Sequence, residues 1–374
     1  MLNHIAVIFL LVALGGTLMI GNILGPAYAG VPGFWTAGAP MLDPRTGTGV
    51  EGAAASHISG KIYVSHGFRG GDSFLLSSYD IASDTWTHGG AGLPDAFTFT
   101  SELGGASENG KHYAIGGRAG PDNFVEEFDP VGATWASKTV MPTARATQHS
   151  VAEVAGKIYV IAGRTGATPF SGGVLSANEV YDVASDSWTP LAPIPTAVSD
   201  AVALAFNNKI YIFGGADNAG TVLSLVQIYD IASDTWNNGS PMPTTRGAHS
   251  GGLCGSNMHI VGGFDGTIVN SQSHEVYDPI TDSWSADTPM PVGITEVQGV
   301  SVGNQIFFIG SGIFGLSGSD NQIWNCESKV IGGEFLPIDS TALVLAGAQS
   351  FSWMIPVVLS VLGIGLFAVS RKNE

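Results

Sequence analysis

The stretch Lys157-Ile-Tyr-Val-Ile-Ala-Gly163 decides the fold of this chain, because closely similar stretches occur five more times. The other copies are Lys61-Ile-Tyr-Val-Ser-His-Gly67, Lys111-His-Tyr-Ala-Ile-Gly-Gly117, Lys209-Ile-Tyr-Ile-Phe-Gly-Gly215, Met258-His-Ile-Val-Gly-Gly263 and Gln305-Ile-Phe-Phe-Ile-Gly-Ser311. Short apolar runs that end in glycine are typical of β-strands followed by turns. A pattern that returns about every 48 residues predicts one structural unit per copy.

Each of the first five copies is followed by a second signal, an aromatic residue next to aspartate and then a tryptophan. The tryptophan comes seven residues after the aromatic residue in every case: Tyr79 and Trp86, Phe128 and Trp135, Tyr181 and Trp188, Tyr229 and Trp236, Tyr277 and Trp284. The 52 glycines and 19 prolines are spread over turn positions rather than gathered in runs. This distribution favours many short strands, and therefore an all-β fold.

The apolar strand, the Gly-Gly pair, the Tyr-Asp pair and the tryptophan together resemble the kelch repeat over roughly residues 31 to 328. The resemblance implies a β-propeller with one four-stranded sheet per repeat. We expect Gly117, Gly215 and Gly263 to allow close approach between blades, because glycine has no Cβ. We expect the tryptophans to pack between adjacent sheets, each burying on the order of 200 Å². The predicted structural tryptophans are Trp35, Trp86, Trp135, Trp188, Trp236 and Trp284.

The sixth repeat has a third strand around Gln322-Ile-Trp324 but no tryptophan seven residues later. The missing piece occurs near the start of the chain, where Trp35-Thr-Ala-Gly-Ala-Pro-Met41 matches Trp236-Asn-Asn-Gly-Ser-Pro-Met242. We therefore predict a six-bladed kelch β-propeller closed by an N-terminal strand. Such closure removes an open sheet edge.

The N-terminal segment, residues 1–29, is predicted to be a signal peptide. Residues 5 to 24 are apolar, and Ala27-Tyr-Ala29 has the small-residue pattern of a cleavage site. The segment is long for a signal core and has no Lys or Arg before it, so an uncleaved anchor is the alternative. Under both interpretations the propeller, residues 30–328, is exported from the cell.

The C-terminal segment, residues 351–370, is predicted to be one transmembrane helix. It is almost free of charge, and at 1.5 Å per residue its length gives about 30 Å, enough to cross a bilayer core. Arg371-Lys372 follows it, so residues 371–374 are expected to be cytoplasmic and the propeller extracellular. Residues 329–350 form the expected stalk. The segment from Thr341 into the helix is similar to the tails of cell-surface proteins of some archaea.

The composition excludes some classes of binding partner and some kinds of metal and disulfide site. The formal net charge of −17 repels phosphate backbones, so no nucleic-acid partner is expected. The two cysteines, Cys254 and Cys326, cannot form a disulfide framework or a four-thiolate zinc site. A single bridge between them stays open as a possibility, but two buried thiols are the favoured interpretation. No cofactor and no metal site are predicted, since the nine histidines show no paired metal spacing.

Loops at one end of a propeller commonly carry binding residues. Directly after the glycines come arginines in the first three repeats and aspartates in the next two: Arg69, Arg118, Arg164, Asp217 and Asp265. Before the expected innermost strands come two further pairs, Arg145 with His149 and Arg246 with His249. One face with a basic half and an acidic half could hold a carboxylate or sugar acid through bidentate arginines. The favoured interpretation is that these residues only cap turns between blades.

The primary hypothesis is a non-enzymatic surface module that binds an extracellular protein or glycan through one propeller face. No residue is assigned a catalytic role in it. The alternative is a carbohydrate-active enzyme, because six-bladed kelch proteins include sialic-acid mutarotases, whose reaction needs only acid–base groups in a pocket. For that alternative the resemblance points to four candidates: His149, His249, Glu296 and Arg246.

Overall fold

The computed structural model describes residues 33–69, 73–89, 93–98, 100–118, 123–148, 150–165, 170, 173–312, 317–326, 329–331 and 334–336. One compact unit spans Gly33–Glu327. The second unit contains both chain ends, and its described part is the antiparallel pair β25 (Lys329–Ile331) and β26 (Glu334–Leu336). In the described part of the chain, no helix is long and apolar enough to cross a membrane. The predicted signal segment and membrane helix lie outside the described residues and stay predictions.

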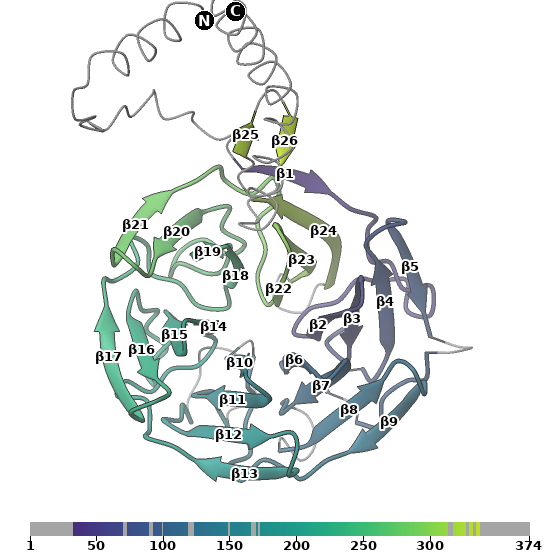
Figure 1. The fold of residues 1–374 in the computed structure, drawn as a ribbon, viewed down its shortest axis with the longest axis horizontal. Helices are drawn as coiled ribbons and strands as arrows, with labels where there is room; N and C mark the ends of the chain where they lie inside the picture. The colour runs from purple at the N-terminus through teal and green to yellow at the C-terminus, as the bar shows by residue number, and fades with distance from the viewer. Residues whose placement is uncertain are drawn as a thin grey trace, which may run out of the picture. The chain divides into compact units, whose positions relative to one another are not determined.

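The larger unit is a ring of six four-stranded antiparallel sheets, so the prediction of an all-β, six-bladed propeller is confirmed (Figure 1). Blade 1 comprises β2 (Ala54–Ile58), β3 (Lys61–Ser65), β4 (Leu76–Asp80) and β5 (Thr85–His88). Blade 2 comprises β6 (Gly104–Glu108), β7 (Lys111–Ile115), β8 (Val125–Asp129) and β9 (Thr134–Ser137). Blade 3 comprises β10 (Val151–Val154), β11 (Lys157–Ile161), β12 (Asn178–Asp182) and β13 (Ser187–Pro190). Blade 4 comprises β14 (Val202–Phe206), β15 (Lys209–Phe213), β16 (Val226–Asp230) and β17 (Thr235–Gly239). Blade 5 comprises β18 (Ser250–Cys254), β19 (Asn257–Val261), β20 (His274–Asp278) and β21 (Ser283–Ala286).

Blade 6 takes its outer strand from the beginning of the described chain. Its strand order is β1 (Phe34–Ala37), β24 (Ser317–Asn325), β23 (Gln305–Gly312) and β22 (Gly299–Val302). The register places Trp35 opposite Trp324, and the two ring centroids are 5.1 Å apart. Trp35 also donates a 2.9 Å hydrogen bond to the carbonyl of Thr288, which belongs to blade 5. The strand around Trp35 therefore pairs with the sixth sheet, as its similarity to the other tryptophan segments predicts.

The tryptophans of the other blades connect consecutive blades through hydrogen bonds as well as packing. In blade 3, Trp188 lies against Tyr181 at 5.2 Å and its indole nitrogen donates to the carbonyl of Thr139. The Tyr181 hydroxyl donates to Asp186, whose carboxylate also accepts the amide of Thr139. Only Trp135 of the repeat tryptophans is buried, because the outermost strand has one side open to solvent. The indoles thus pack between sheets less completely than the sequence suggests.

The expected close approach at the glycines is present. Gly215 has φ +89, and a Cβ built there would lie 2.5 Å from the carbonyl oxygen of Ser199. Gly263 has the same φ, and its Cβ would meet the side chain of His249 at 2.6 Å. Any larger residue at these positions would force adjoining segments apart.

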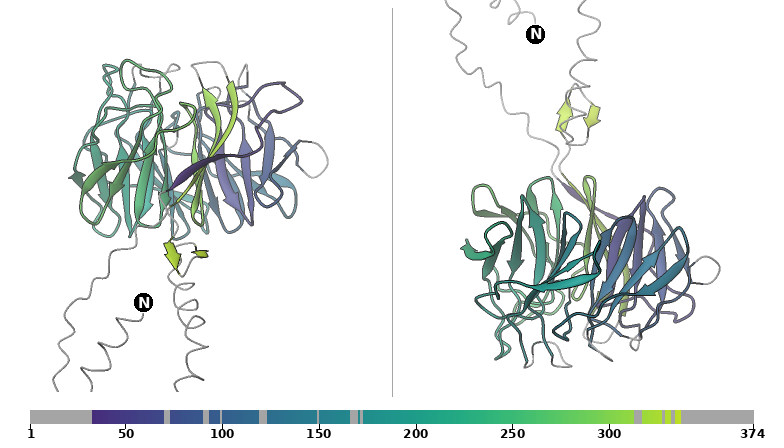
Figure 2. Two further views of the ribbon diagram at one scale, coloured as in Figure 1. Left: turned by 90° about the horizontal axis from the view of Figure 1, so that it is seen from above. Right: turned by 60° about the horizontal axis from the view of Figure 1, so that its bottom comes forward.

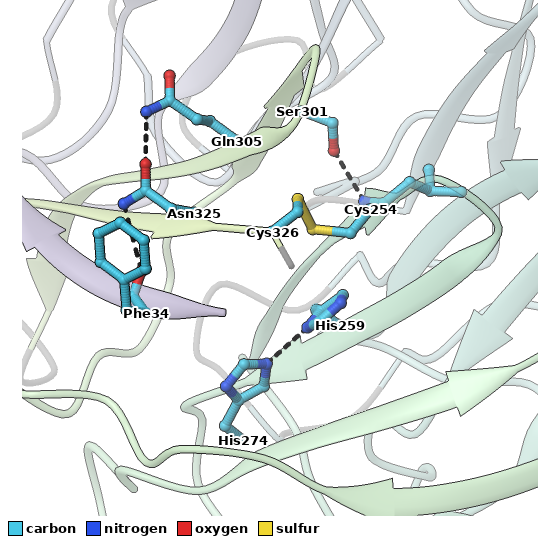
Figure 3. Close-up of a disulfide and its surroundings, with 9 residues drawn as sticks. Phe34, Cys254, His259, His274, Ser301, Gln305, Asn325 and Cys326 are labelled. Atoms are coloured by element: carbon cyan, nitrogen blue, oxygen red, sulfur yellow. Dashed lines mark hydrogen bonds between the residues drawn. A yellow bond between two sulfur atoms is a disulfide. The ribbon is translucent and has the colours of Figure 1, made fainter. Parts of the chain in front are cut away.

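Cys254 and Cys326 form a disulfide, so the favoured interpretation of two separate thiols was wrong (Figure 3). Cys254 ends β18 in blade 5 and Cys326 follows β24 in blade 6, which places their Cα atoms 5.7 Å apart. The two residues are 72 positions apart in sequence, and only the ring arrangement makes them neighbours. The bridge joins the blade that contains β1 to the blade before it.

Each blade leaves its innermost strand facing the axis of the ring, and each innermost strand contacts those of both neighbouring blades. In side view the connecting segments gather at the two ends of the strands (Figure 2). We call one end the loop end. It carries the segments between the second and third strands of each blade and those that join consecutive blades. An axial cavity of about 310 Å³ is lined by residues of all six innermost strands.

Candidate functional site

The site residues that were predicted from the sequence, and that the structure describes, all lie in segments of the loop end, as the strand order requires. His149 lies outside the described residues. The contacts of the remaining residues differ, and they divide the predicted face into structural residues and a cluster at the axis.

Arg145 and Arg246 are ion-paired inside their own blades. Both side chains are fully buried. Arg145 donates to Glu179 at 2.6 Å and to the carbonyl of Val160, so it joins the second and third strands of blade 3. Arg246 lies 2.9 Å from Glu275 and donates to the carbonyl of Gly262 in blade 5. These contacts stabilise the sheets and hold the guanidinium groups away from the loop surface.

Asp217 and Asp265 shape the turns in which they lie. The carboxylate of Asp217 accepts the amides of Ala219 and Thr221. The carboxylate of Asp265 accepts the amides of Thr267 and Ile268. Such local hydrogen bonds are typical of aspartate in turns.

Arg69 belongs to a separate group of charges in blade 1. Its guanidinium is buried, and its nearest charged partner is Asp43, with Nη1 and Oδ2 3.7 Å apart. Burial lowers the pKa of Arg69 to about 10, opposed by the attraction of Asp43. Arg45 binds the same aspartate at 2.6 Å. Arg69 is therefore not brought together with the arginines of blades 2 and 3.

The loop end of the axis is bounded by one residue from each blade, just before the innermost strand, and we call this ring the channel mouth. All six residues have a left-handed backbone: Gly52, Glu102, Gln148, Asp200, Ala248 and Glu296. Their backbone amides donate to the carbonyl of the equivalent residue in the preceding blade in five described cases, with distances from 2.7 to 3.2 Å. Left-handed backbone is costly for residues other than glycine and tends to persist at functional positions.

Acidic and neutral residues alternate around the channel mouth. Blades 2, 4 and 6 contribute Glu102, Asp200 and Glu296, while blades 1, 3 and 5 contribute neutral residues. Glu51 adds a fourth buried carboxyl group next to Gly52. The four carboxyl groups lie near two guanidinium groups, those of Arg118 and Arg164. We call these six charged residues the mouth cluster.

The two arginines of the mouth cluster are committed to its carboxylates. Arg164 pairs with Glu102, and its Nε lies 3.5 Å from Asp200 Oδ1. Arg118 donates to Glu102 at 3.0 Å and is the more exposed of the two. Burial raises the pKa of Glu102 to about 7, although the nearby Arg164 opposes the shift.

Glu296 is the least compensated acid of the mouth cluster. Burial raises its pKa well above the usual range, and repulsion from Glu102, Glu51 and Asp200 adds to the effect. The residue is 4% exposed, and its Oε1 has no hydrogen-bond partner among the residues that the structure describes. Gln148 is 2% exposed, and neither Oε1 nor Nε2 of its side chain is hydrogen-bonded within the described part of the chain. Buried polar atoms without partners are rare and point to a missing binding partner or water.

The mouth cluster can therefore accept a positively charged group. Four carboxyl groups face two guanidinium groups, and an added cation would oppose the burial and the carboxylate repulsion that raise the pKa of Glu296. Two arginines of the expected basic half, Arg118 and Arg164, pair with Glu102. The expectation that this face holds a carboxylate or sugar acid stays a prediction.

Three of the six residues of the mouth cluster, Glu51, Glu102 and Asp200, were not predicted from the sequence, although a signal existed for two of them. A hydroxyl residue followed by an acid precedes the innermost strand in alternate repeats: Ser101-Glu102, Ser199-Asp200 and Thr295-Glu296. Of the four candidates for the enzyme alternative, Glu296 belongs to the cluster and Arg246 does not. His249 is buried one residue after Ala248 of the channel mouth.

Comparison with known proteins supports the repeat assignment. The family model described as KLHDC2/KLHL20/DRC7 Kelch-repeats domain matches residues 104–312. Kelch-like protein 35 of Mus musculus is 30% identical over 165 residues, 43% of this chain and 26% of that protein. Kelch-like protein 25 of Xenopus tropicalis is 34% identical over 113 residues, 28% of this chain and 19% of that protein. The matched regions thus span about a quarter or less of these relatives.

A similar fold is present in the solved structure of YjhT. That structure has a TM-score of 0.62 and 15% sequence identity, and the match covers 79% of this chain and 99% of that one. At this identity the similarity concerns the fold alone. The family match spans more than half of the sequence and agrees with the six observed sheets, and the chain therefore belongs to the kelch-repeat family.

Proposed function

We propose that this protein is a non-enzymatic binding module whose loop end takes a protein ligand with a cationic side chain directed into the channel mouth. The observation that carries the proposal is the excess of buried carboxyl groups over guanidinium groups, together with the unpartnered atoms of Glu296 and Gln148. A lysine or arginine side chain supplies a positive charge and hydrogen-bond donors for the two unpartnered oxygens, Glu296 Oε1 and Gln148 Oε1. The matched relatives are named Kelch-like proteins, and the proposal for a protein ligand is in keeping with that family.

A peptide library tests the ligand chemistry. The full-length chain, purified in detergent and immobilised, is panned against a random-peptide phage library. We expect the enriched peptides to contain Lys or Arg and to lose affinity for the variant Glu102→Gln/Glu296→Gln by about tenfold or more, as for removal of charge-assisted contacts.

Asp217→Asn/Asp265→Asn serves as the matched control. It removes the same number of negative charges at the loop end, and asparagine can still accept the turn hydrogen bonds of these aspartates. We expect this variant to bind the enriched peptides as the unaltered protein does. Peptides without cationic residues, bound equally by both variants, would refute the proposal.

We propose further that the propeller is displayed outside the cell and held by residues 351–370, with residues 371–374 in the cytoplasm. The apolar ends and the Arg371-Lys372 pair support this topology, and a disulfide is typical of oxidising compartments. On intact expressing cells, we expect added protease to degrade the propeller and to spare a tag placed after Glu374. A propeller that becomes sensitive only after cell lysis would contradict this location.

One observation favours the enzyme alternative as a second candidate. Burial raises the pKa of Glu102 to about 7 and also raises the pKa of neighbouring Glu296, so the mouth cluster contains a carboxyl group, that of Glu102, that can exchange protons near neutral pH. Exchange between the anomers of sialic acid, followed by NMR with catalytic amounts of protein, would support this function if Glu296→Gln abolishes it. No acceleration by the unaltered protein would exclude sialic-acid mutarotation.

A further inference from the structure

Two buried histidines face each other in blade 5, away from the mouth cluster. His259 lies in β19 and His274 in the neighbouring strand β20, and Figure 3 shows their rings turned toward one another. His259 Nδ1 and His274 Nε2 are 2.7 Å apart. Asp287, directly after β21, brings a carboxylate oxygen near both, so that one ligand atom of each residue lies within 4.8 Å of the others.

Both histidines depart from the repeat. The position of His259 holds tyrosine in the first four blades, as in Tyr211. The position of His274 holds leucine, valine or asparagine in the other blades, as in Val226. A tyrosine in one strand and an aliphatic residue in the next pack well without hydrogen bonds. Packing alone therefore does not require two imidazole groups here.

Hydrogen bonds fix which nitrogen of His274 carries the proton. Its Nδ1 lies 2.9 Å from the carbonyl oxygen of Thr288, which can only accept, so Nδ1 donates. In the neutral ring, Nε2 then presents a lone pair toward His259 Nδ1. Histidines that bind metals almost always donate their second nitrogen to a carbonyl or carboxylate in this way.

We propose that His259, His274 and Asp287 form a binding site for a divalent transition metal ion, for which Zn²⁺ is the representative. Two imidazoles and one carboxylate suit zinc, and a water molecule completes a tetrahedral set. Ligand atoms on a tetrahedral zinc are about 3.3 Å apart, so the 2.7 Å hydrogen bond between the rings must open on binding. Asp287 is partly exposed, which gives the ion a route from solvent.

The site lies beside the junction between blades 5 and 6. The carbonyl of Thr288 that orients His274 also accepts the indole nitrogen of Trp35 from β1. The ring of His274 lies 5.5 Å from that of Trp35 and 4.6 Å from that of Trp324. A metal ion that fixes His274 and Asp287 would thus stabilise the segment that holds β1.

The test uses the full-length chain with an affinity tag that contains no histidine, freed of metal with EDTA. We expect calorimetric titration with ZnCl₂ to show one ion per chain, and about 100 µM Zn²⁺ to raise the melting temperature because it binds only the folded state. His274→Gln is expected to abolish both effects. Asp287→Asn, at a partly exposed position that does not endanger folding, is expected to weaken binding by about tenfold or more.

His57→Gln is the matched control, since His57 lines the axial cavity and lies outside this group. It should bind Zn²⁺ as the unaltered protein does, and Mg²⁺ should give neither heat nor stabilisation because imidazole is a poor ligand for it. The absence of zinc binding would overturn the proposal. If His274→Gln and Asp287→Asn both bind Zn²⁺ as tightly as the unaltered protein, the ion binds elsewhere, and the proposal is overturned as well.

Discussion

Removal of the disulfide should destabilise the propeller strongly, because the bridge closes a long loop between two blades. Cys254 ends the innermost strand of blade 5, and Cys326 follows the strand of blade 6 that pairs with β1. The perturbation is the double substitution Cys254→Ser/Cys326→Ser, which keeps both side chains small. It leaves every strand pairing in place and removes only the covalent connection.

The length of the closed loop sets the expected size of the effect. For a sequence separation of 72 residues, the chain-entropy relation gives about 4 kcal/mol of stabilisation at 25 °C. A unit of about 300 residues gains roughly 0.6 kcal/mol per kelvin of unfolding entropy, so the melting temperature should fall by about 7 °C. A loss of this size is a substantial fraction of the stability of an ordinary domain.

Thermal unfolding of the full-length chain, followed by circular dichroism with and without reductant, measures the effect. Reductant should lower the melting temperature of the unaltered protein to that of the double variant, and it should leave the variant unchanged. This comparison separates the bridge from any effect of the serine side chains. Two cysteines that react with a maleimide in the unfolded, unreduced chain would refute the reasoning, as would a double variant that melts at the original temperature.

Three further predictions concern single side chains. Trp35→Ala should lower the free energy of unfolding by about 3 kcal/mol and increase hydrogen exchange in β24. Trp236→Ala should leave hydrogen exchange in β24 unchanged. Equal exchange in β24 of the two variants would contradict a closing role for β1. Arg145→Met should lower the free energy of unfolding, measured by urea denaturation, by about 3–5 kcal/mol, because it leaves the buried Glu179 without its ion-pair partner. Adding Glu179→Leu to the same chain should recover much of this loss. Burial, with repulsion from a neighbouring histidine, lowers the pKa of His112 to about 3, while the unfolded chain takes up its proton near pH 6.5. Stability should therefore fall with pH from 6.5 toward 3, by about 2 kcal/mol between pH 6.5 and 5, and His112→Gln should reduce this loss; urea curves with the same midpoint at both pH values would contradict it.

The sequence by itself determined the repeat and therefore the blades. Every copy has an apolar run followed by a glycine, and five copies have a tryptophan seven residues after an aromatic residue; these are local requirements of a strand, its turn and its outer edge. The N-terminal strand was equally visible, because Trp35 and its neighbours repeat the tryptophan segment of the other blades. Periodicity of this kind survives in the sequence, since each unit must solve the same packing problem.

Side-chain partners were decided by the tertiary structure alone. Arg69 and Arg118 both follow the glycine that ends a strand in their repeats, yet Arg69 lies beside Asp43 in blade 1 and Arg118 belongs to the mouth cluster. The acids of blades 2, 4 and 6 converge because the ring closes, and the two cysteines meet for the same reason. Distances between residues far apart in the chain depend on how many blades the ring contains and how they are oriented. Spacing within one repeat carries no information on either.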